Sequence, residues 1–201
     1  SITRDRKHMT DVFIVSAVRT AVGAFGGALR DTPPSELGVA TAKEAIARAG
    51  IPVDAIGHAV YGQVLPSEPR DAYMARIIAL ESGLPIETPA LTVNRLCGSG
   101  LQAIVSAAQA LLLGDCDAAL AGGAESMSRT PFHLPTHRWG RKLGDAVLVD
   151  ALNEGLKDPF DRVLMGITAE NVAERHGIDR ARQDAIALES HRRATAAIAQ
   201  G

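Results

Sequence analysis

The chain has 201 residues, a formal net charge of −2, and ordinary shares of apolar and charged residues. This composition allows one or two domains with a real hydrophobic core. Basic residues do not alternate with aromatic ones, which argues against nucleic acid as a partner. No apolar run approaches the roughly twenty residues that a membrane span needs. We therefore expect a cytoplasmic protein that has neither a membrane nor nucleic acid as a partner.

The first eight residues are polar and basic and contain no apolar stretch, which argues against a secretory signal. Met9 is interpreted as the natural start of the protein. Residues 1–8 are then a leader or a remnant of expression. They carry no weight in the prediction of the fold.

Strands and helices are predicted to alternate from residue 12 onward. Apolar runs and helical spacings predict, in chain order, a strand at 12–18, a helix at 37–49, a strand at 56–64, a helix at 74–83, a strand at 91–93, a helix at 101–112 and a strand at 116–121. The connections are short, and no internal repeat is visible. This order favours a layered α/β fold with helices on the faces of a sheet.

Cys97 lies where a predicted strand ends and a predicted helix begins. The unpaired backbone N–H groups and the dipole of a helix N-terminus stabilise an anion, so this position favours the nucleophilic thiolate. Gly98 and Gly100 have no side chains and let a substrate approach the sulfur. On spacing alone, the alternative is a small buried apolar side chain beside a tight turn.

The second cysteine, Cys116, has a different setting. It lies between Asp115 and Asp117 at the end of a predicted helix. Two carboxylates raise the pKa of a neighbouring thiol, so we do not expect Cys116 to act as a nucleophile. Two cysteines also suggest neither a disulfide framework nor a zinc site, which needs four ligands, and we expect no metal.

The last third of the chain changes character. Residues 125–164 contain prolines, histidines and basic residues in an irregular pattern, which is typical of a functional or disordered segment. Two helices are predicted after it, with Thr168 and Asp179 as their N-caps.

Four motifs resemble signatures of the thiolases, in the order found in that family. They are Val-Ser-Ala-Val-Arg-Thr at 15–20 with glycines beyond it, Val-Asn-Arg-Leu-Cys-Gly-Ser-Gly at 93–100, Ala-Gly-Gly-Ala-Glu-Ser-Met-Ser at 121–128 and Met-Gly-Ile-Thr-Ala-Glu-Asn-Val-Ala at 165–173. Within the family the chain resembles the bacterial short-chain β-ketothiolases. The resemblance implies a layered α/β/α fold. Residues 9–122 would form the amino-terminal α/β domain, and 123–201 part of the loop domain that covers the CoA site.

The resemblance also implies the chemistry of Cys97. Its sulfur would take an acyl group from a CoA thioester and pass it to the acetyl-CoA carbanion or back to CoA. The backbone N–H of Cys97 would form part of an oxyanion hole. Asn94 and Ser99 would shape the turn, and Gly122 and Gly123 would let backbone pass near the site.

Two further positions are carried over from the family. Leu156 and Met165 would flank the pantetheine and acyl portion of the ligand, with ordinary core packing as the alternative for both. Leu164 departs from the histidine of many short-chain members. The basic residues of the loop would offset CoA phosphates or a neighbouring subunit, or form a solvated loop. The family uses CoA thioesters as substrates without a further cofactor, and it is dimeric or tetrameric.

Three motifs of the family do not occur in residues 1–201: the Gly-His-Pro that activates the nucleophile, the second cysteine before a glycine-rich run, and Asn-Glu-Ala-Phe. The chain therefore corresponds to the amino-terminal part of a thiolase, and we expect it to be inactive by itself. One alternative is a non-catalytic interaction module that binds a complementary chain. Another is a ketosynthase-type condensing enzyme of the same fold, although the motif around Cys97 differs from that of such enzymes.

Overall fold

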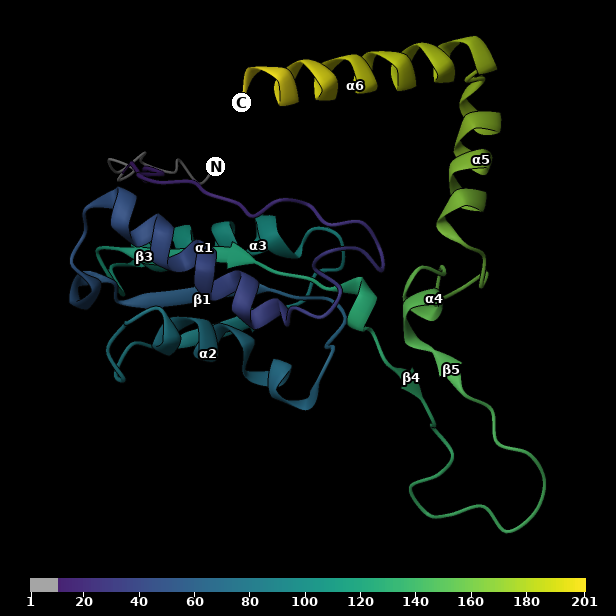
Figure 1. Ribbon diagram of the computed structural model, residues 1–201, viewed down its shortest axis with the longest axis horizontal. Helices are drawn as coiled ribbons and strands as arrows, with labels where there is room; N and C mark the ends of the chain where they lie inside the picture. The colour runs from purple at the N-terminus through teal and green to yellow at the C-terminus, as the bar shows by residue number, and fades with distance from the viewer. Residues whose placement is uncertain (1–10) are drawn as a thin grey trace, which may run out of the picture. The chain divides into compact units, whose positions relative to one another are not determined.

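A computed structural model describes residues 11–201, so the predicted leader at 1–8 lies outside the described residues. The chain divides into two compact units, one that ends at Leu152 and a second that spans Asn153–Gly201 (Figure 1). This division follows internal packing. The predicted domain boundary at residue 122 therefore stays a prediction.

The first unit is built on a three-stranded parallel sheet. Its strands are β1 (His58–Gly62), β2 (Ala90–Val93) and β3 (Ala119–Gly123), in the order β2-β1-β3. In this register Ala59 of β1 lies between Ala90 and Leu120. The strands predicted at 56–64, 91–93 and 116–121 are confirmed with small shifts of their ends.

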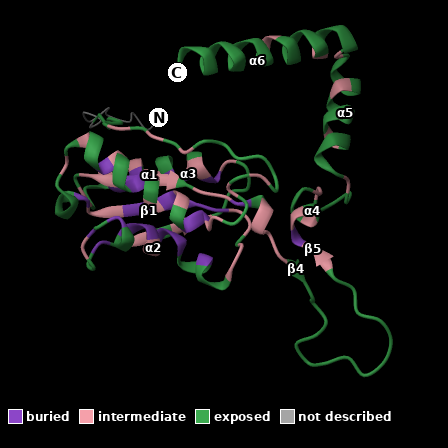
Figure 2. Ribbon diagram, viewed as in Figure 1, coloured by how far each residue is buried: buried purple, intermediate pink, exposed green. Residues whose placement is uncertain are grey.

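Helices cover both faces of this sheet, as a layered α/β fold requires. They are α1 (Pro34–Ala49), α2 (Met74–Glu81) and α3 (Ser99–Leu113). Successive side chains of a strand point to opposite faces. Ala59 and Tyr61 accordingly pack with residues of α1 and α2, whereas Val60 packs with α3. The central strand is therefore buried on both sides (Figure 2).

The larger core cluster lies between α1, α2 and the sheet. Met74 and Ile78 of α2 are fully buried in it. Gly38 of α1 gives Ile78 its space, because a Cβ at residue 38 would lie 2.3 Å from Cδ1 of Ile78. The two helices approach closely at a position where α1 has no side chain.

The opposite face of the sheet is covered by α3. Ala103 and Ala107 pack against Val60, while Leu101 and Leu113 are exposed. The segment Leu96–Leu113 has a mean hydropathy of 1.6 and is long and apolar enough to cross a membrane by length and composition. The expectation that no segment meets this criterion is therefore wrong. Core helices of soluble proteins also meet it, and the alanines of α3 contact the sheet as those of a core helix do.

The segment 12–18 is not a strand, so that prediction is wrong. It is extended and without ladder pairing, and Phe13, Ile14 and Val15 are exposed. A cavity of about 800 Å³ is lined by this segment together with residues of α1, α3 and β3. The apolar run is suited to a buried strand. To be buried as a strand, however, residues 12–18 need a neighbouring strand, and no strand pairs with them among residues 11–201.

The predicted irregular segment at 125–164 contains little regular structure. Its main element is a short antiparallel pair, β4 (Phe132–His133) with β5 (Val149–Asp150), which encloses an exposed loop. The described part of the first unit also contains the short 3-10 helices η1 (Val53–Ala55), η2 (Pro69–Tyr73) and η3 (Met127–Arg129).

The remaining helices are α4 (Ala151–Gly155), α5 (Met165–His176) and α6 (Arg180–Gln200). Asp179 caps α6 as predicted, because its carboxylate accepts the N–H of Arg182 at 2.8 Å. Thr168 does not cap α5, which begins three residues earlier and has Leu164 at its N-cap. The hydroxyl of Thr168 instead donates to the Met165 carbonyl within the first turn.

Candidate active site around Cys97

Cys97 lies in the turn between β2 and α3, one residue before the N-cap Gly98. Its side chain is exposed. The predicted position at a helix N-terminus is confirmed, and the alternative of a buried apolar side chain is wrong. An exposed thiol beside the positive end of a 15-residue helix is accessible to an electrophilic substrate.

The backbone just before Cys97 is strained. Leu96 has a φ of 50°, in the left-handed region that costs a non-glycine residue roughly 1 kcal/mol or more. Its N–H donates to Oδ1 of Asn94 at 3.0 Å, and its carbonyl accepts the Ser99 hydroxyl at 2.6 Å. Ser99 Oγ also accepts the N–H of Arg95 at 2.8 Å. Asn94 and Ser99 thus shape the turn, as expected.

Glycines let the first turn of α3 lie directly on the ends of the central strands. A Cβ at Gly62 would lie 2.5 Å from the backbone carbon of Ser99. A Cβ at Gly123 would lie 3.4 Å from Cα of Gly100. The carboxyl ends of β1 and β3 therefore support the helix N-terminus that follows Cys97. The expected close passage of backbone at Gly123 is present.

Glu125 is a residue that sequence reasoning missed. It follows β3, and its half-buried carboxylate accepts the N–H groups of Val64 at 2.8 Å and Leu65 at 3.1 Å. Burial raises the pKa of Glu125, while these two hydrogen bonds oppose the rise. The only signal in the sequence is an acidic residue two positions after the glycines that end a strand.

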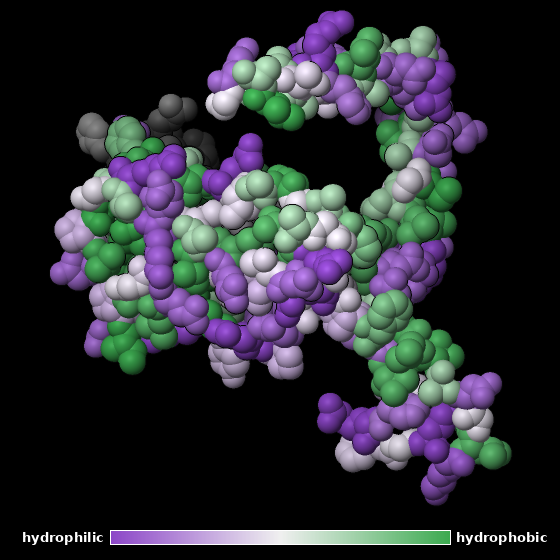
Figure 3. All heavy atoms as spheres, viewed as in Figure 1, coloured by the Kyte–Doolittle hydropathy of each residue, from purple (hydrophilic) through white to green (hydrophobic). Residues whose placement is uncertain are grey.

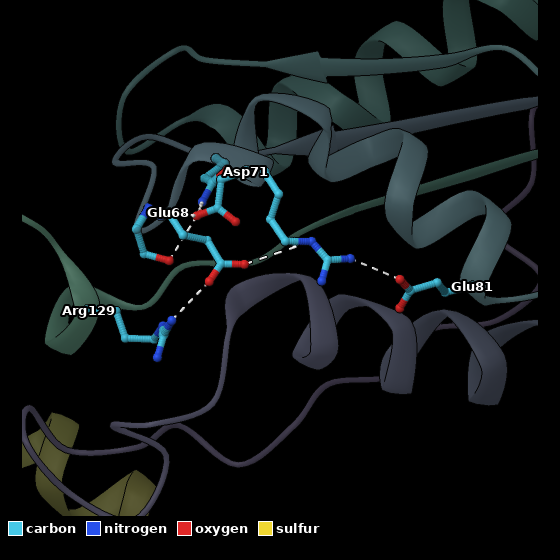
Figure 4. Close-up of polar contacts among 7 residues, drawn as sticks. Glu68, Asp71, Glu81 and Arg129 are labelled. Carbon is cyan, nitrogen blue, oxygen red and sulfur yellow. Dashed lines mark hydrogen bonds and ion pairs between the residues drawn. The ribbon is translucent and has the colours of Figure 1, made fainter.

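Figure 4 shows a charged network that includes Glu68, Asp71 and Arg129. The charge of Asp71 contributes to the raised pKa of Glu125. Asp71 is buried, and its Oδ2 accepts the N–H and the hydroxyl of Ser67 at 2.6 and 2.8 Å. Glu68 forms an ion pair with Arg129 at 3.0 Å. Among the basic residues noted in the sequence, Arg129 is thus engaged within the first unit.

Cys116 differs from Cys97 in each respect that matters for reactivity. Its thiol is half-buried. Burial is the largest cause that raises the pKa of Cys116, and the carboxylates of Asp115 and Asp117 raise it further. The expected elevation is confirmed, with burial as the larger contribution.

Leu156 and Met165 lie in the second unit and contact each other through the backbone. The Met165 N–H donates to the Leu156 carbonyl at 3.1 Å, so the structure brings these two predicted residues together. Their side chains are 40% and 46% exposed, which argues against ordinary core packing. Cys97 belongs to the first unit, and the grouping of all three residues around one ligand stays a prediction.

Within residues 11–201, no group of three or more His, Cys, Asp or Glu side chains lies close enough to hold a metal ion. The chemistry that this site supports is nucleophilic attack by the exposed thiol.

Comparison with known proteins identifies relatives over nearly the whole chain. Residues 12–201 match the family described as "Thiolase, N-terminal domain". The chain is 59% identical to beta-ketothiolase BktB of Cupriavidus necator over 95% of its length. It is 47% identical to an acetyl-CoA acetyltransferase of the same bacterium over 94%. Each alignment covers 48% of the relative, so the chain spans about half the length of these curated relatives.

Solved structures agree in fold. The crystal structure of human mitochondrial 3-ketoacyl-CoA thiolase in complex with CoA has a TM-score of 0.90 and 41% identity, over 94% of this chain and 48% of that one. The Bacillus anthracis acetyl-CoA acetyltransferase has a TM-score of 0.89 and 40% identity, with the same coverage of both chains.

Proposed function

Because this chain belongs to the thiolase family, we propose that it supplies Cys97 as the acyl-accepting nucleophile of a β-ketothiolase reaction on CoA thioesters. The observation that carries this proposal is the exposed thiol in a strained turn immediately before α3. The relative at 59% identity is named a β-ketothiolase, which supports this subgroup over a plain acetyl-CoA acetyltransferase.

The proposed reaction has two acyl transfers. The Cys97 thiolate attacks the carbonyl carbon of an acyl-CoA, the carbon–sulfur bond to CoA breaks, and CoA leaves as its thiol after it takes up a proton. The carbanion of acetyl-CoA then attacks the acyl-cysteine, a carbon–carbon bond forms, and the Cys97 thiolate is released. Thiolysis is the reverse. The Cys97 N–H would stabilise the oxyanion in both steps.

The rest of the proposal concerns the ligand and the assembly. Leu156 and Met165 would flank the pantetheine and acyl groups, CoA thioesters would be the only non-protein participants, and the protein would act in the cytoplasm as a homodimer or homotetramer. The chain lacks the family's Gly-His-Pro, second-cysteine and Asn-Glu-Ala-Phe motifs. We therefore expect no turnover by the 201-residue chain alone.

A fusion tests this proposal. The chain would be joined to the half of Cupriavidus necator beta-ketothiolase that it does not match, and thiolysis of acetoacetyl-CoA would be measured. We expect turnover by the fusion, loss of turnover in Cys97→Ala, and retention in the matched Cys116→Ala. Turnover that survives in Cys97→Ala, or thiolysis by the chain alone, would contradict the proposal.

A second candidate function is an interaction module that binds a complementary chain. The exposed apolar side chains Leu101, Val105 and Leu112, which share one face of α3, favour it, since a contiguous exposed apolar surface commonly marks an association site. Gel filtration of the chain mixed with the same unmatched half distinguishes the two candidates. A stoichiometric complex without thiolysis would support the module.

A further inference from the structure

The carboxylate of Glu125 is linked to the nucleophile turn by a short series of hydrogen bonds. It accepts the Val64 N–H, and the carbonyl of the same Val64 accepts Nδ2 of Asn94 at 3.0 Å. Oδ1 of Asn94 in turn accepts the Leu96 N–H at 3.0 Å. Leu96 precedes Cys97 directly. Glu125, Val64 and Leu96 come from three separate connections at the same end of the sheet.

Val64 and Asn94 each form hydrogen bonds to two different partners in this series. Val64 bonds through its N–H to Glu125 and through its carbonyl to Asn94. The side-chain amide of Asn94 donates to one connection and accepts from the other. The segment after β1 is also fixed by the N–H of Gln63, which donates to the Val93 carbonyl at 3.1 Å. Val64 is thereby connected by hydrogen bonds, through Asn94, to the strained residue Leu96.

We propose that Glu125 is a positioning residue for Cys97, because its carboxylate fixes Val64 and, through Asn94, holds the left-handed turn that presents the thiol. This inference rests on the proposed function, in which Cys97 is the nucleophile. Glu125 itself touches neither substrate nor sulfur in this scheme. Its effect is exerted through backbone geometry.

The two N–H groups make a carboxylate the suitable side chain at position 125. An ionised carboxylate has only acceptors, so both of its oxygens are available to the backbone donors of Val64 and Leu65. Glutamine has the same shape, but its NH₂ group would face one of these N–H groups as a second donor. Glu125→Gln therefore breaks one of the two bonds without a change in volume.

The test measures how fast each cysteine reacts with dithiodipyridine, followed by mass spectrometry of the peptides. Cys116 is an internal reference in the same chain, and Glu44→Gln, an exposed glutamate on α1, is the matched control for loss of charge. Since the lost hydrogen bond acts on Cys97 only through Val64 and Asn94, we expect Glu125→Gln to slow the reaction of Cys97 roughly three- to tenfold and to leave that of Cys116 unchanged.

A double-mutant cycle separates positioning from general destabilisation. Asn94→Asp keeps the acceptor for the Leu96 N–H and removes the donor to Val64. If Glu125 acts through Asn94, Glu125→Gln has little further effect in the Asn94→Asp background, and the added charge of Asp cancels in the cycle. Additive slowing would overturn the proposal. So would an unchanged Cys97 rate in Glu125→Gln.

The pH profile adds a readout that a merely structural role does not affect. When the wild-type carboxyl is protonated, it too presents a donor to the backbone, so the wild-type and Glu125→Gln rates at Cys97 should converge as pH falls through the pKa of Glu125. Burial raises that pKa, and the charge facing it is Asp71 of η2, which raises it further. A rate ratio that stays constant with pH would contradict the mechanism.

The proposal can be tested even if one variant fails to fold, and independently of acyl transfer. If Glu125→Gln does not fold by circular dichroism, Asn94→Asp alone decides, because a wild-type Cys97 rate in that variant overturns the proposal. Thiol modification requires no acyl transfer. The coupling can therefore fail while thiolysis by the fusion persists, and thiolysis can fail while the coupling persists.

Discussion

The two units of the chain are stabilised in different ways. The first has a buried interior in which side chains far apart in sequence meet, such as Ile46 of α1, Ile78 of α2 and Leu120 of β3. In the second, no residue from Asn153 to Gly201 is buried. Its helix α6 has ion pairs between residues four apart, such as Arg180 with Asp184 at 3.4 Å, and apolar and polar residues are interspersed along it (Figure 3).

This difference indicates what each unit needs in order to fold. Exposed ion pairs of neighbouring helix residues contribute only about 0.3–0.5 kcal/mol each. Buried apolar side chains contribute about 1.5–3 kcal/mol each. The first unit therefore has a core of its own to fold around. The helices of the second depend on local capping and on whatever covers Ile186 and Leu188, which are exposed in this chain.

The largest expected effect on stability comes from a cavity created in the core of the first unit. Ile78→Ala removes a fully buried side chain and should lower the free energy of unfolding by about 2–5 kcal/mol. The matched Ile186→Ala on α6 should change it by no more than about 0.5 kcal/mol, because that side chain is 66% exposed. Urea denaturation followed by circular dichroism measures both. Similar losses would mean that the second unit has a core of its own.

A glycine pair sharpens the comparison by giving effects of opposite sign. Gly62→Ala places a Cβ 2.5 Å from the Ser99 backbone, which cannot move as a side chain would, and should cost about 1–3 kcal/mol. Gly166→Ala in α5 meets nothing within 4 Å and should stabilise the helix by up to about 1 kcal/mol. Denaturation midpoints provide the measurement. A destabilising Gly166→Ala would show hidden packing around α5.

Much of the first unit could be predicted from local pattern. The period of apolar residues is sufficient for α1, α2 and α3, because each buries one face against a sheet. The segment 12–18 has an equally clear pattern and was predicted wrongly. A strand is defined by its partner, and the identity of that partner is not encoded in seven apolar residues. Local sequence specifies the surface to be buried and leaves open what covers it.

The residues of the site also differ in whether local sequence could predict them. Cys97, Asn94 and Ser99 lie within six residues of each other, and their motif predicted both the turn and its position before a helix. Glu125 could not be predicted, because it binds the backbone N–H groups of residues about sixty positions earlier. A backbone donor has no side-chain signature. The prediction that Thr168 is an N-cap is wrong for a different reason. Any threonine near the start of a helix satisfies the sequence pattern of an N-cap.

In the second unit, loss of a helix cap should destabilise α6 more than loss of an exposed ion pair. Asp179→Ala removes the acceptor of the Arg182 N–H and should cost α6 about 1 kcal/mol. Asp184→Ala removes only an exposed ion-pair partner of Arg180 and should cost about 0.3–0.5 kcal/mol. Hydrogen exchange of the α6 amides gives the local effect. Equal protection in both variants would contradict the role of the cap.

The smallest expected effect is a pH dependence whose sign differs between the units. The pKa of Glu125 is raised, so its native form holds the proton more tightly than the unfolded chain. Its contribution is greatest below the unfolded pKa and is lost as pH rises through the folded pKa. The pKa of Glu154 is lowered by hydrogen bonds from Lys157 and Arg162. Its contribution is present above the unfolded pKa and is lost as pH falls through the folded one.

Acidification from neutral pH should therefore favour the first unit through Glu125 and weaken the second through Glu154. Denaturation midpoints measured as a function of pH test this. In Glu125→Gln the gain of the first unit on acidification should disappear, and in Glu154→Gln the loss of the second should disappear. If both variants changed the pH dependence in the same direction, burial would not be the dominant influence on Glu125. Its two backbone hydrogen bonds, which lower the pKa, would then outweigh desolvation, and the carboxylate would be the stable form that holds Val64.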